Sequence, residues 1–329
     1  MTQYVLEVEP DVDESSRRLA EELLDEWGII PAGETVRIAR LSGGASNVNL
    51  RISAGESTWA LRLCDPLGER WGVDRAATIQ AQNDAAEMGL APRVVAQKMP
   101  AGHFLSEFVE GTTVTSEYVR EADLLEPIAR TLRELNAGST TGRVFSPFRD
   151  LGTFLEFGDG DGVGFAPQIT DELAAVTRIR ALFETRPAPR GFCHSDLVPQ
   201  NFIRHGDTLS LVDFDYAGTG WVAFELASFS CQAQLDAEET HAFLSAYDPD
   251  YDEGQAARVE LMRAIAGIRE ACWAYMAEPI LSGSTAPLDG WTYQGYAANN
   301  LAQARGVLAD GRLEQYLSAA RHVRPGALF

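Results

Sequence analysis

The sequence is poor in lysine, in cysteine and in long apolar runs, and each shortage excludes something. Lys98 is the only lysine among 329 residues, so any basic side chain that holds phosphate is expected to be an arginine. Four scattered cysteines without a CxxC pair favour reduced, mostly buried thiols in a cytoplasmic protein over a disulfide framework. There is no uncharged apolar run of about 18 residues, which argues against a membrane-spanning helix. The acid-rich N-terminal stretch does not resemble a signal peptide.

The formal net charge of −21 limits the classes of partner. Nucleic acid and anionic membrane surfaces both require basic patches, so neither is an expected partner. An acidic surface can steer a cationic small molecule towards the protein, although most of these charges are better explained as a solvated surface. The charge thus leaves a small molecule open as the partner, and the oligomeric state is left open as well.

The first part of the chain has the pattern of a sheet with two helices. Apolar residues at helical spacing predict a helix over 13–27, and residues 72–89 resemble a second helix that ends at Gly89. Strand-like runs lie at 35–41, 48–53, 58–64, 91–97 and 102–111. We therefore expect residues 1–110 to form an α+β unit with a meandering antiparallel sheet.

From about Thr115 the pattern becomes mainly helical. Helices are predicted at 121–137, 170–185, 237–247, 254–277 and 294–309. A loop and two short strands are predicted within 190–218, and the glycine- and aspartate-rich residues 157–166 are predicted to form another loop. The second unit is expected to span residues 111–329.

The strongest chemical signal lies within 190–218. Asp196 is followed five positions later by Asn201, and Asp213 comes at the end of the next strand-like run. An aspartate on a loop can accept the proton of an attacking hydroxyl, and the oxygens of Asn and Asp are ligands that Mg²⁺ prefers. Phosphoryl transfer needs mainly positioning and charge neutralisation from a protein. The pattern predicts a phosphotransferase with Asp196 as base and with Asn201 and Asp213 at the metal.

The same segment resembles a known family. The run CHSDLVPQNF followed by LSLVDFDYAG is similar to the catalytic segment of the choline/ethanolamine kinases and the aminoglycoside phosphotransferases. The resemblance implies a protein-kinase-like bilobal fold, with a small antiparallel-sheet lobe over 1–110 and a larger helical lobe over 111–329. It implies ATP and Mg²⁺ as cofactors. It also implies that His194 packs the loop and that Glu225 braces it in place of an aspartate.

A glycine-rich turn supplies the other half of the resemblance. Residues 41–49, LSGGASNVN, lie between two strand-like runs and are similar to the family's LSGGxTNxN loop, in which glycines let backbone N–H groups approach phosphate. The resemblance implies that Arg62 holds phosphate and that Glu107 lies in the hinge strand beside adenine. The nucleotide-binding residues are predicted to be Ser42, Gly43, Gly44, Ser46, Asn47, Arg62 and Glu107.

One departure from the family pattern concerns the helix after that turn. The family has a glutamate there that pairs with the basic residue of the strand, whereas this chain has Thr78. The pairing that orients Arg62 is therefore expected to be missing, or to be replaced by Gln82 or Asp84. The departure leaves open a slow kinase, an unusual nucleotide geometry, or a nucleotide-binding pseudokinase or regulatory binding protein without turnover.

Aromatic residues gather near two acids, Glu270 and Glu278, towards the end of the chain. In choline kinases, similar segments box a quaternary ammonium group through cation–π attraction. Packing in the core is an equally weighted explanation, because aromatic residues at helical spacing usually do this. The acceptor-site residues are predicted to be Asp215, Tyr216, Glu270, Trp273, Trp291 and Tyr296. We expect phosphorylation of a choline- or ethanolamine-like amino alcohol, with an aminoglycoside or other antibiotic kinase as the alternative.

Overall fold

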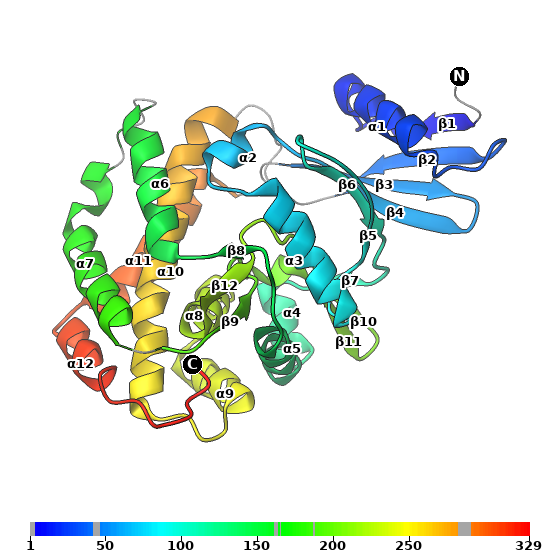
Figure 1. Cartoon of the computed structure of the whole chain (residues 1–329). Helices are drawn as coiled ribbons and strands as arrows, with labels where there is room; N and C mark the ends of the chain where they lie inside the picture. The colour runs from blue at the N-terminus through cyan, green and yellow to red at the C-terminus, as the bar shows by residue number, and fades with distance from the viewer. Residues whose placement is uncertain (1–3, 42–46, 161–163, 165, 187, 282–290) are drawn as a thin grey trace.

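The computed structural model describes residues 4–41, 47–160, 164, 166–186, 188–281 and 291–329. A six-stranded sheet lies at one end of the molecule and a group of long helices at the other (Figure 1). The sheet has the order β1-β2-β3-β4-β6-β5 and consists of β1 (Val5–Val8), β2 (Thr35–Arg40), β3 (Val48–Ala54), β4 (Ser57–Leu63), β5 (Val94–Lys98) and β6 (His103–Glu107). The predicted strand segments of the first part of the chain are therefore confirmed.

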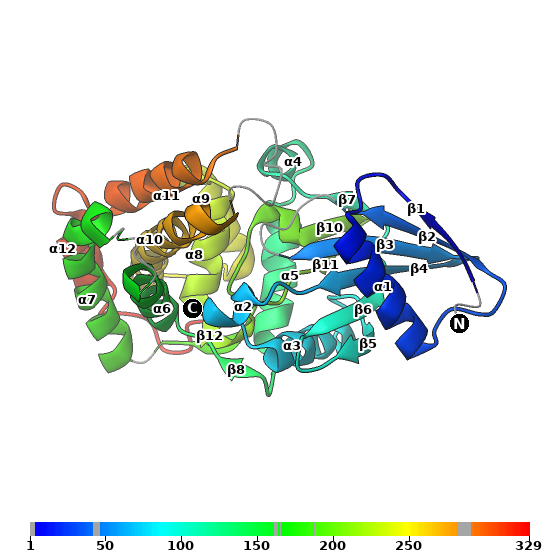
Figure 2. The ribbon, with the colours of Figure 1, turned by 90° about the horizontal axis from the view of Figure 1, so that it is seen from above.

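The sheet is antiparallel except at its edge, where β1 pairs parallel to β2. The sequence did not predict β1, because four residues of alternating exposed and half-buried character carry little signal. The predicted helix over 13–27 is confirmed as α1 (Glu14–Trp27), which lies across one face of the sheet (Figure 2). Asp13 caps its start, and Gly28, with a φ of 61°, ends it.

Between β4 and β5 the chain forms α2 (Leu67–Arg70) and α3 (Arg75–Glu87). The predicted helix over 72–89 corresponds to α3, which is shorter at its start because the Asp74 side chain caps it by accepting from the Ala77 N–H. Gly89 has a φ of 77° and ends the helix as expected.

The rest of the described chain is mainly helical, with two small three-stranded sheets. The helices are α4 (Ser116–Glu121), α5 (Leu125–Ala137), α6 (Pro147–Gly160), α7 (Thr170–Thr185), α8 (Val222–Gln232), α9 (Ala237–Tyr247), α10 (Glu253–Leu281), α11 (Tyr293–Leu308) and α12 (Arg312–Ala319). The small sheets have the orders β11-β10-β7 and β8-β12-β9, with β7 (Thr112–Thr113), β8 (Arg143–Val144), β9 (Arg190–Cys193), β10 (Phe202–His205), β11 (Thr208–Leu211) and β12 (Gly218–Trp221). Short 3-10 turns cover Ala166–Ile169 and Pro199–Asn201.

Two predictions about element bounds were wrong, and some helices were not predicted. The expected helix over 121–137 corresponds to α5, which begins only at Leu125 and has Pro127 in its first turn, where proline is tolerated. The expected loop over 157–166 is helical up to Gly160, because Phe157 packs in the core against Trp71 and this burial overrides the glycine-rich composition. The sequence also gave no sign of α8, whose residues Val222–Cys231 are all buried and therefore show no amphipathic period.

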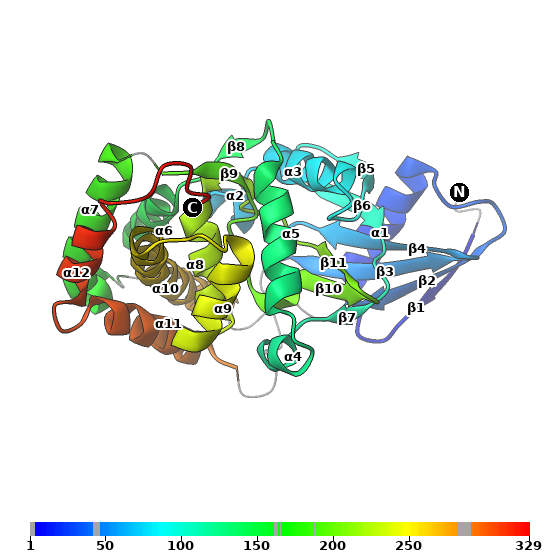
Figure 3. The ribbon, with the colours of Figure 1, turned by 90° about the horizontal axis from the view of Figure 1, so that it is seen from below.

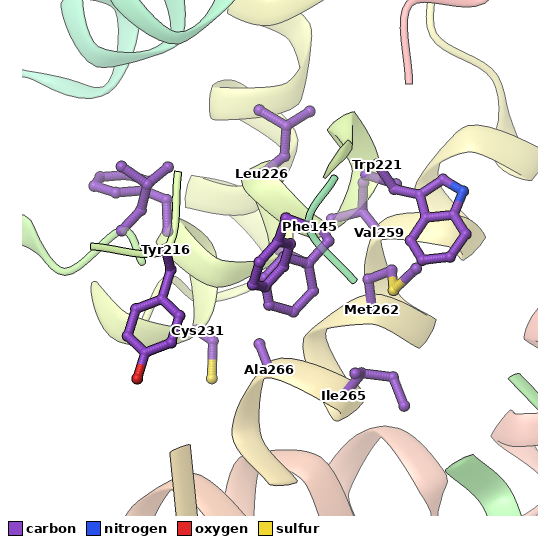
Figure 4. Packing of buried hydrophobic residues seen from close by; sticks show 14 of the residues in the cluster. Phe145, Tyr216, Trp221, Leu226, Cys231, Val259, Met262, Ile265 and Ala266 are labelled. Carbon is purple, nitrogen blue, oxygen red and sulfur yellow. The ribbon is translucent and has the colours of Figure 1, made fainter. Parts of the chain in front are cut away.

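The helical part is organised around α10, of whose 29 residues 20 are buried. Phe145 and Trp221 belong to the same core cluster as Met262 of α10, and Tyr216 lies at one side of the group drawn in Figure 4. Seen from below, α5 lies between the six-stranded sheet and the helices α6, α8, α10 and α11 (Figure 3). The four cysteines are free and buried, as expected. Among the described residues, none of the helices combines the length and the apolar character needed to cross a bilayer.

Candidate active site

The loop from His194 to Asn201 connects β9 to β10 and is held from beneath by Glu225 of α8. The backbone N–H groups of His194 and Ser195 donate to the two carboxylate oxygens of Glu225 at 2.7 and 2.8 Å. Glu225 is fully buried, and this burial raises its pKa from the ordinary 4.5 to about 7. The expected bracing role of Glu225 is therefore confirmed by its contacts.

His194 is fully buried inside this loop. Its Nε2 lies 2.9 Å from the carbonyl oxygen of Val212, and its ring contacts that of Phe214 at a centroid distance of 4.8 Å. Burial lowers the pKa of His194, which favours the neutral ring. The side chain therefore ties the loop to the segment that carries Asp213, as the predicted packing role requires.

Hydrogen bonds bring Asp196, Asn201 and Asp213 together. The Asn201 amide nitrogen donates to the backbone oxygen of Asp196 at 2.8 Å, and the N–H of Val212, next to Asp213, donates to the backbone oxygen of Asn201 at 3.0 Å. The carboxylates of Asp196 and Asp213 both remain partly exposed, at 27% and 29% of their side-chain surface. Asp213 has a φ of 69°, a strained value for a residue other than glycine.

The electrostatics of Asp196 show that several acids face one region. Burial raises the pKa of the Asp196 carboxyl, and Glu270, Asp213 and Asp215 raise it further, while Arg269 acts in the opposite direction. Two buried arginines gather these acids in pairs, since Arg269 contacts Asp196 and Glu270 while Arg62 contacts Asp213 and Asp215. A carboxylate that is partly exposed and easily protonated suits a group that takes a proton during a reaction.

The donor set fits magnesium held together with a nucleotide. Among the described residues, no group of three or more His, Cys, Asp or Glu side chains could enclose a metal ion. Mg²⁺ is usually bound by one or two carboxylates together with substrate phosphates, and it keeps several waters. Asp213 offers a partly exposed carboxylate, and Asn201 commits its amide nitrogen to Asp196, which leaves its amide oxygen for a cation.

The residues predicted to bind nucleotide are only partly described. Ser42, Gly43, Gly44 and Ser46 lie outside the described residues. Asn47 is buried, and its amide nitrogen donates to Asp215 at 3.1 Å while its amide oxygen accepts from the Asp65 N–H at 3.0 Å.

Glu107 is the last residue of β6 and is exposed. Its backbone N–H donates to the carbonyl oxygen of Arg93 at 2.9 Å, and its carboxylate accepts from the Arg93 N–H at 3.1 Å. These contacts engage the N–H and the carboxylate with the neighbouring chain, and a role of Glu107 beside adenine stays a prediction.

Arg62 of β4 is buried and forms two ion pairs. Its Nη2 lies 2.8 Å from Asp213 Oδ1 and 2.6 Å from Asp215 Oδ2. The prediction that Gln82 or Asp84 pairs with Arg62 was wrong. Gln82 donates to the carbonyl oxygen of Pro92, and Asp84 accepts from Gln80 on the solvent side of α3.

Asp215 was predicted to lie beside the acceptor, which stays a prediction, and its observed contacts are with Arg62, Asn47 and Thr78. Its carboxylate accepts from Arg62 and Asn47, and the Thr78 hydroxyl lies 3.5 Å away. Arg62 lies on β4, Thr78 on α3 and Asn47 directly before β3, and Arg62 and Asn47 are two of the residues predicted to bind nucleotide. Burial raises the pKa of Asp215, and Arg62 acts in the opposite direction.

Arg269 of α10 is the residue in this region that the sequence analysis missed. It is 2% exposed, and its guanidinium forms ion pairs with Glu270, with Asp150 at 3.2 Å and with Asp196 at 3.5 Å. The same group lies 4.4 Å from the centre of the Tyr216 ring. The available signal was an Arg-Glu pair inside the otherwise apolar run AIAGIREACWAY, since buried charges are rare unless they are paired.

The predicted aromatic cluster forms between α10 and α11. Ring centroids of Trp273 and Tyr296 are 6.2 Å apart, those of Trp291 and Tyr296 are 5.8 Å apart, and Tyr293 contacts both tryptophans. The Tyr296 hydroxyl donates to Glu270 at 2.9 Å, which joins the cluster to the acids around Arg269. Trp273, Trp291 and Tyr296 are packed and also partly exposed, so the contacts accommodate both a core role and a binding role.

Two cavities lie away from these side chains. One of about 480 Å³ is lined in part by Phe183, Arg190 and Trp221, and one of about 430 Å³ lies beside Met88 and Arg204. The described linings of both lack the residues discussed above. The site is therefore identified by its contacts and charges.

Comparison with known proteins places these contacts in a family context. Residues 37–257 match the family described as the phosphotransferase enzyme family. The chain is 32% identical over 243 residues to a human choline/ethanolamine kinase, an alignment that covers 66% of this chain and 60% of the relative. It is 29% identical over 185 residues to a homoserine kinase from Gluconobacter oxydans, covering 54% of each. The alignments thus span little more than half of these relatives.

A solved structure shares the fold over almost the whole chain. A choline/ethanolamine kinase family protein from Mesorhizobium loti superposes with a TM-score of 0.72 and 20% identity, covering 92% of this chain and 99% of the other. This similarity establishes the expected protein-kinase-like architecture, with a sheet-containing N-terminal region and a helical C-terminal region. At this identity it establishes the fold alone.

Proposed function

The chain belongs to the phosphotransferase enzyme family, and we propose that it transfers the γ-phosphate of ATP, in the presence of Mg²⁺, to a hydroxyl group of a small molecule. The nucleotide-binding lobe in this proposal covers residues 1–110, and the lobe that carries the base and receives the acceptor covers residues 111–329. The observation that carries the proposal is the convergence of Asp196, Asn201 and Asp213, joined by the hydrogen bonds of one loop and supplemented by Arg62 from the sheet.

In the proposed reaction, Asp196 takes the proton of the acceptor hydroxyl. The acceptor oxygen forms a bond to the γ-phosphorus while the bond from that phosphorus to the bridging oxygen of ADP breaks, so ADP leaves with that electron pair. The Asp196 carboxylate is suited to this step because it is partly exposed and its pKa lies above the ordinary range.

Positive charge at the phosphates comes from two sources in this proposal. Arg62 supplies a permanent guanidinium from β4, which agrees with the near absence of lysine. Mg²⁺, when held by Asn201 and Asp213, supplies neutralisation of the phosphate oxygens. Asn47 and the residues of the glycine-rich turn are proposed to surround the same phosphates.

For the acceptor we propose a small amino alcohol. The support is the partly exposed group of Trp273, Trp291 and Tyr296, which a 2.9 Å hydrogen bond joins to Glu270. Glu270 is in turn linked to Asp196, because Arg269 forms ion pairs with both acids. Aromatic faces and a carboxylate attract an ammonium group. Tyr216 contributes less to such attraction, because Arg269 already lies against its ring.

An acceptor panel tests both parts of the proposal. Purified protein with ATP and Mg²⁺ is incubated with choline, ethanolamine, homoserine and an aminoglycoside, and ADP release is followed together with the phosphorylated product. We expect saturable turnover with an amino alcohol, its loss in Asp196→Asn, and a raised KM for that acceptor in Trp273→Ala. Turnover of the aminoglycoside alone would replace the proposed acceptor. Stabilisation by Mg·ATP without transfer to any acceptor would favour a nucleotide-binding protein without turnover.

A further inference from the structure

Arg62 depends on carboxylates that come from the segment after β11 and not from the neighbouring helix α3. Its guanidinium is 7% exposed and lies 2.8 Å from Asp213 and 2.6 Å from Asp215. A buried guanidinium needs a partner that stays in place, because an unpaired charge away from water is strongly unfavourable. The partner that stays paired therefore determines the position of the Arg62 guanidinium, the group proposed to contact phosphate.

Asp213 has a second task in the proposed function. It is partly exposed and is one of the two residues proposed to bind Mg²⁺, so its oxygens are shared between the cation and Arg62. Asp215 has no such exposure, since 7% of its surface is accessible. Of the two acids, Asp215 is therefore the one that can remain on Arg62 throughout.

Asp215 is held by contacts from two further elements. Asn47, directly before β3, donates to its Oδ2 at 3.1 Å, and Asn47 is itself fixed by the Asp65 N–H at 3.0 Å. On α3, the Thr78 hydroxyl donates to the carbonyl oxygen of Asp74 at 3.0 Å and lies 3.5 Å from Asp215 Oδ1. Thr78 is 3% exposed, so α3 faces Asp215 through a small neutral side chain.

Asp215 lies between α3 and Arg62, since its Oδ1 faces Thr78 while its Oδ2 pairs with Arg62. A carboxylate at position 78 would stand against Asp215, and two like charges in a buried place are strongly unfavourable. With threonine at 78, the buried carboxylate on Arg62 is the one at position 215. A carboxylate at position 78 and one at position 215 are therefore alternative partners for the Arg62 guanidinium.

We propose that Asp215 is the positioning residue for Arg62, holding its guanidinium towards the nucleotide phosphates while Asp213 binds the metal. The inference rests on the proposed function for the identity of the ligand. Because Asp215 follows β11 and Arg62 lies on β4, this ion pair also links the sheet to the segment that carries the metal-binding residues. The contact between Arg62 and phosphate then forms only when the sheet and the segment after β11 are correctly positioned relative to each other.

Moving the carboxylate from 215 to 78 tests the proposal. The variants are Asp215→Asn, Asp215→Ala, Thr78→Glu and the double variant Thr78→Glu with Asp215→Ala. We expect Asp215→Asn to raise the KM for ATP about tenfold or more, with a smaller change in the KM for the acceptor. Thr78→Glu alone is expected to impair ATP use, because it places a second acid beside Asp215. The double variant is expected to exceed Asp215→Ala at least about threefold in kcat/KM for ATP.

Two matched controls separate charge from shape. Thr78→Gln combined with Asp215→Ala has side chains of the same size as Thr78→Glu with Asp215→Ala but lacks the carboxylate. It is therefore not expected to raise kcat/KM for ATP above that of Asp215→Ala. Asp84→Asn removes an acid of the same helix that contacts Gln80 and not Arg62, and it is expected to behave like the wild type. Thermal denaturation of each variant identifies any loss of folding, and Asp215→Asn keeps the test valid if Asp215→Ala does not fold.

Affinity for ADP, measured calorimetrically with EDTA present, gives a readout that needs neither metal nor turnover. Reduced ADP affinity in Asp215→Asn, restored in Thr78→Glu with Asp215→Ala, supports the inference even if no acceptor is phosphorylated, in which case the proposed function fails alone. An active wild type whose Asp215→Asn variant keeps the wild-type KM for ATP and ADP affinity would overturn the inference. Equal ADP affinity in the Glu and Gln double variants would overturn it as well.

Discussion

Removing the carboxylate of Glu225 is expected to release the loop that carries Asp196. In Glu225→Ala, the N–H groups of His194 and Ser195 lose acceptors at 2.7 and 2.8 Å in a fully buried place. A buried donor left without a partner costs about 1–3 kcal/mol, so the two together are expected to lower the free energy of unfolding by roughly 2–6 kcal/mol. The same loss of support is expected to reduce turnover strongly, because the base is no longer held in position.

The pH dependence of that loss is a second signature. Burial raises the pKa of Glu225 from 4.5 to about 7, so between these values the folded state holds a proton that the unfolded state has released. The contribution of Glu225 to stability is therefore fully present below about pH 4.5 and falls as the pH rises through 7. The stability gap between the wild type and Glu225→Ala is expected to be larger at pH 5 than at pH 8, by roughly 3 kcal/mol at most.

Urea denaturation at pH 5, 6.5 and 8 measures both effects, with phosphate transfer followed in parallel. Glu134→Ala removes an exposed acid in the middle of α5 and serves as the matched control, with an expected change within about 0.5 kcal/mol. A Glu225→Ala protein that stays within about 0.5 kcal/mol of the wild type at all three pH values and keeps its turnover would refute the reasoning.

Three further outcomes are expected. Asn136→Ala should lower the free energy of unfolding, measured in urea, by about 1–3 kcal/mol. Asn136 donates to the Phe192 carbonyl and accepts from the Tyr247 hydroxyl, each at 2.9 Å, and an unchanged stability would contradict the importance of these bonds. Ser195→Gly should raise the free energy of unfolding by about 0.5–1 kcal/mol, because Ser195 has a φ of 66°, a backbone conformation that glycine adopts without strain. A lower melting temperature of the variant would argue against strain at this residue. In a profile of kcat/KM against pH, the fall on the acidic side should occur well above pH 4, because the pKa of Asp196 is raised and the base must be ionised. A profile that stays flat down to about pH 5 would contradict this role of Asp196.

The sequence alone determined the features that depend on neighbours in the chain. Asp196 and Asn201 are five residues apart in one loop, so their association is local, and the strand that follows leads directly to Asp213. Asp13 and Gly28 mark the ends of α1 because capping is also a local interaction. The bracing by Glu225 came from resemblance to relatives and not from the physics of the segment.

Only the tertiary structure decided which charges meet. Arg62 and Asp215 are 153 residues apart, and no periodicity in the sequence indicates that they pair. The expected partners Gln82 and Asp84 were instead chosen from α3, the helix that follows Arg62 in the chain, and that choice was wrong. Arg269 appears in the sequence as one polar residue of a long helix, and its contact with Asp196 exists because α10 crosses the core beside the loop. A hydrophobic pattern reports which face of an element is buried, whereas packing determines which other element lies against that face.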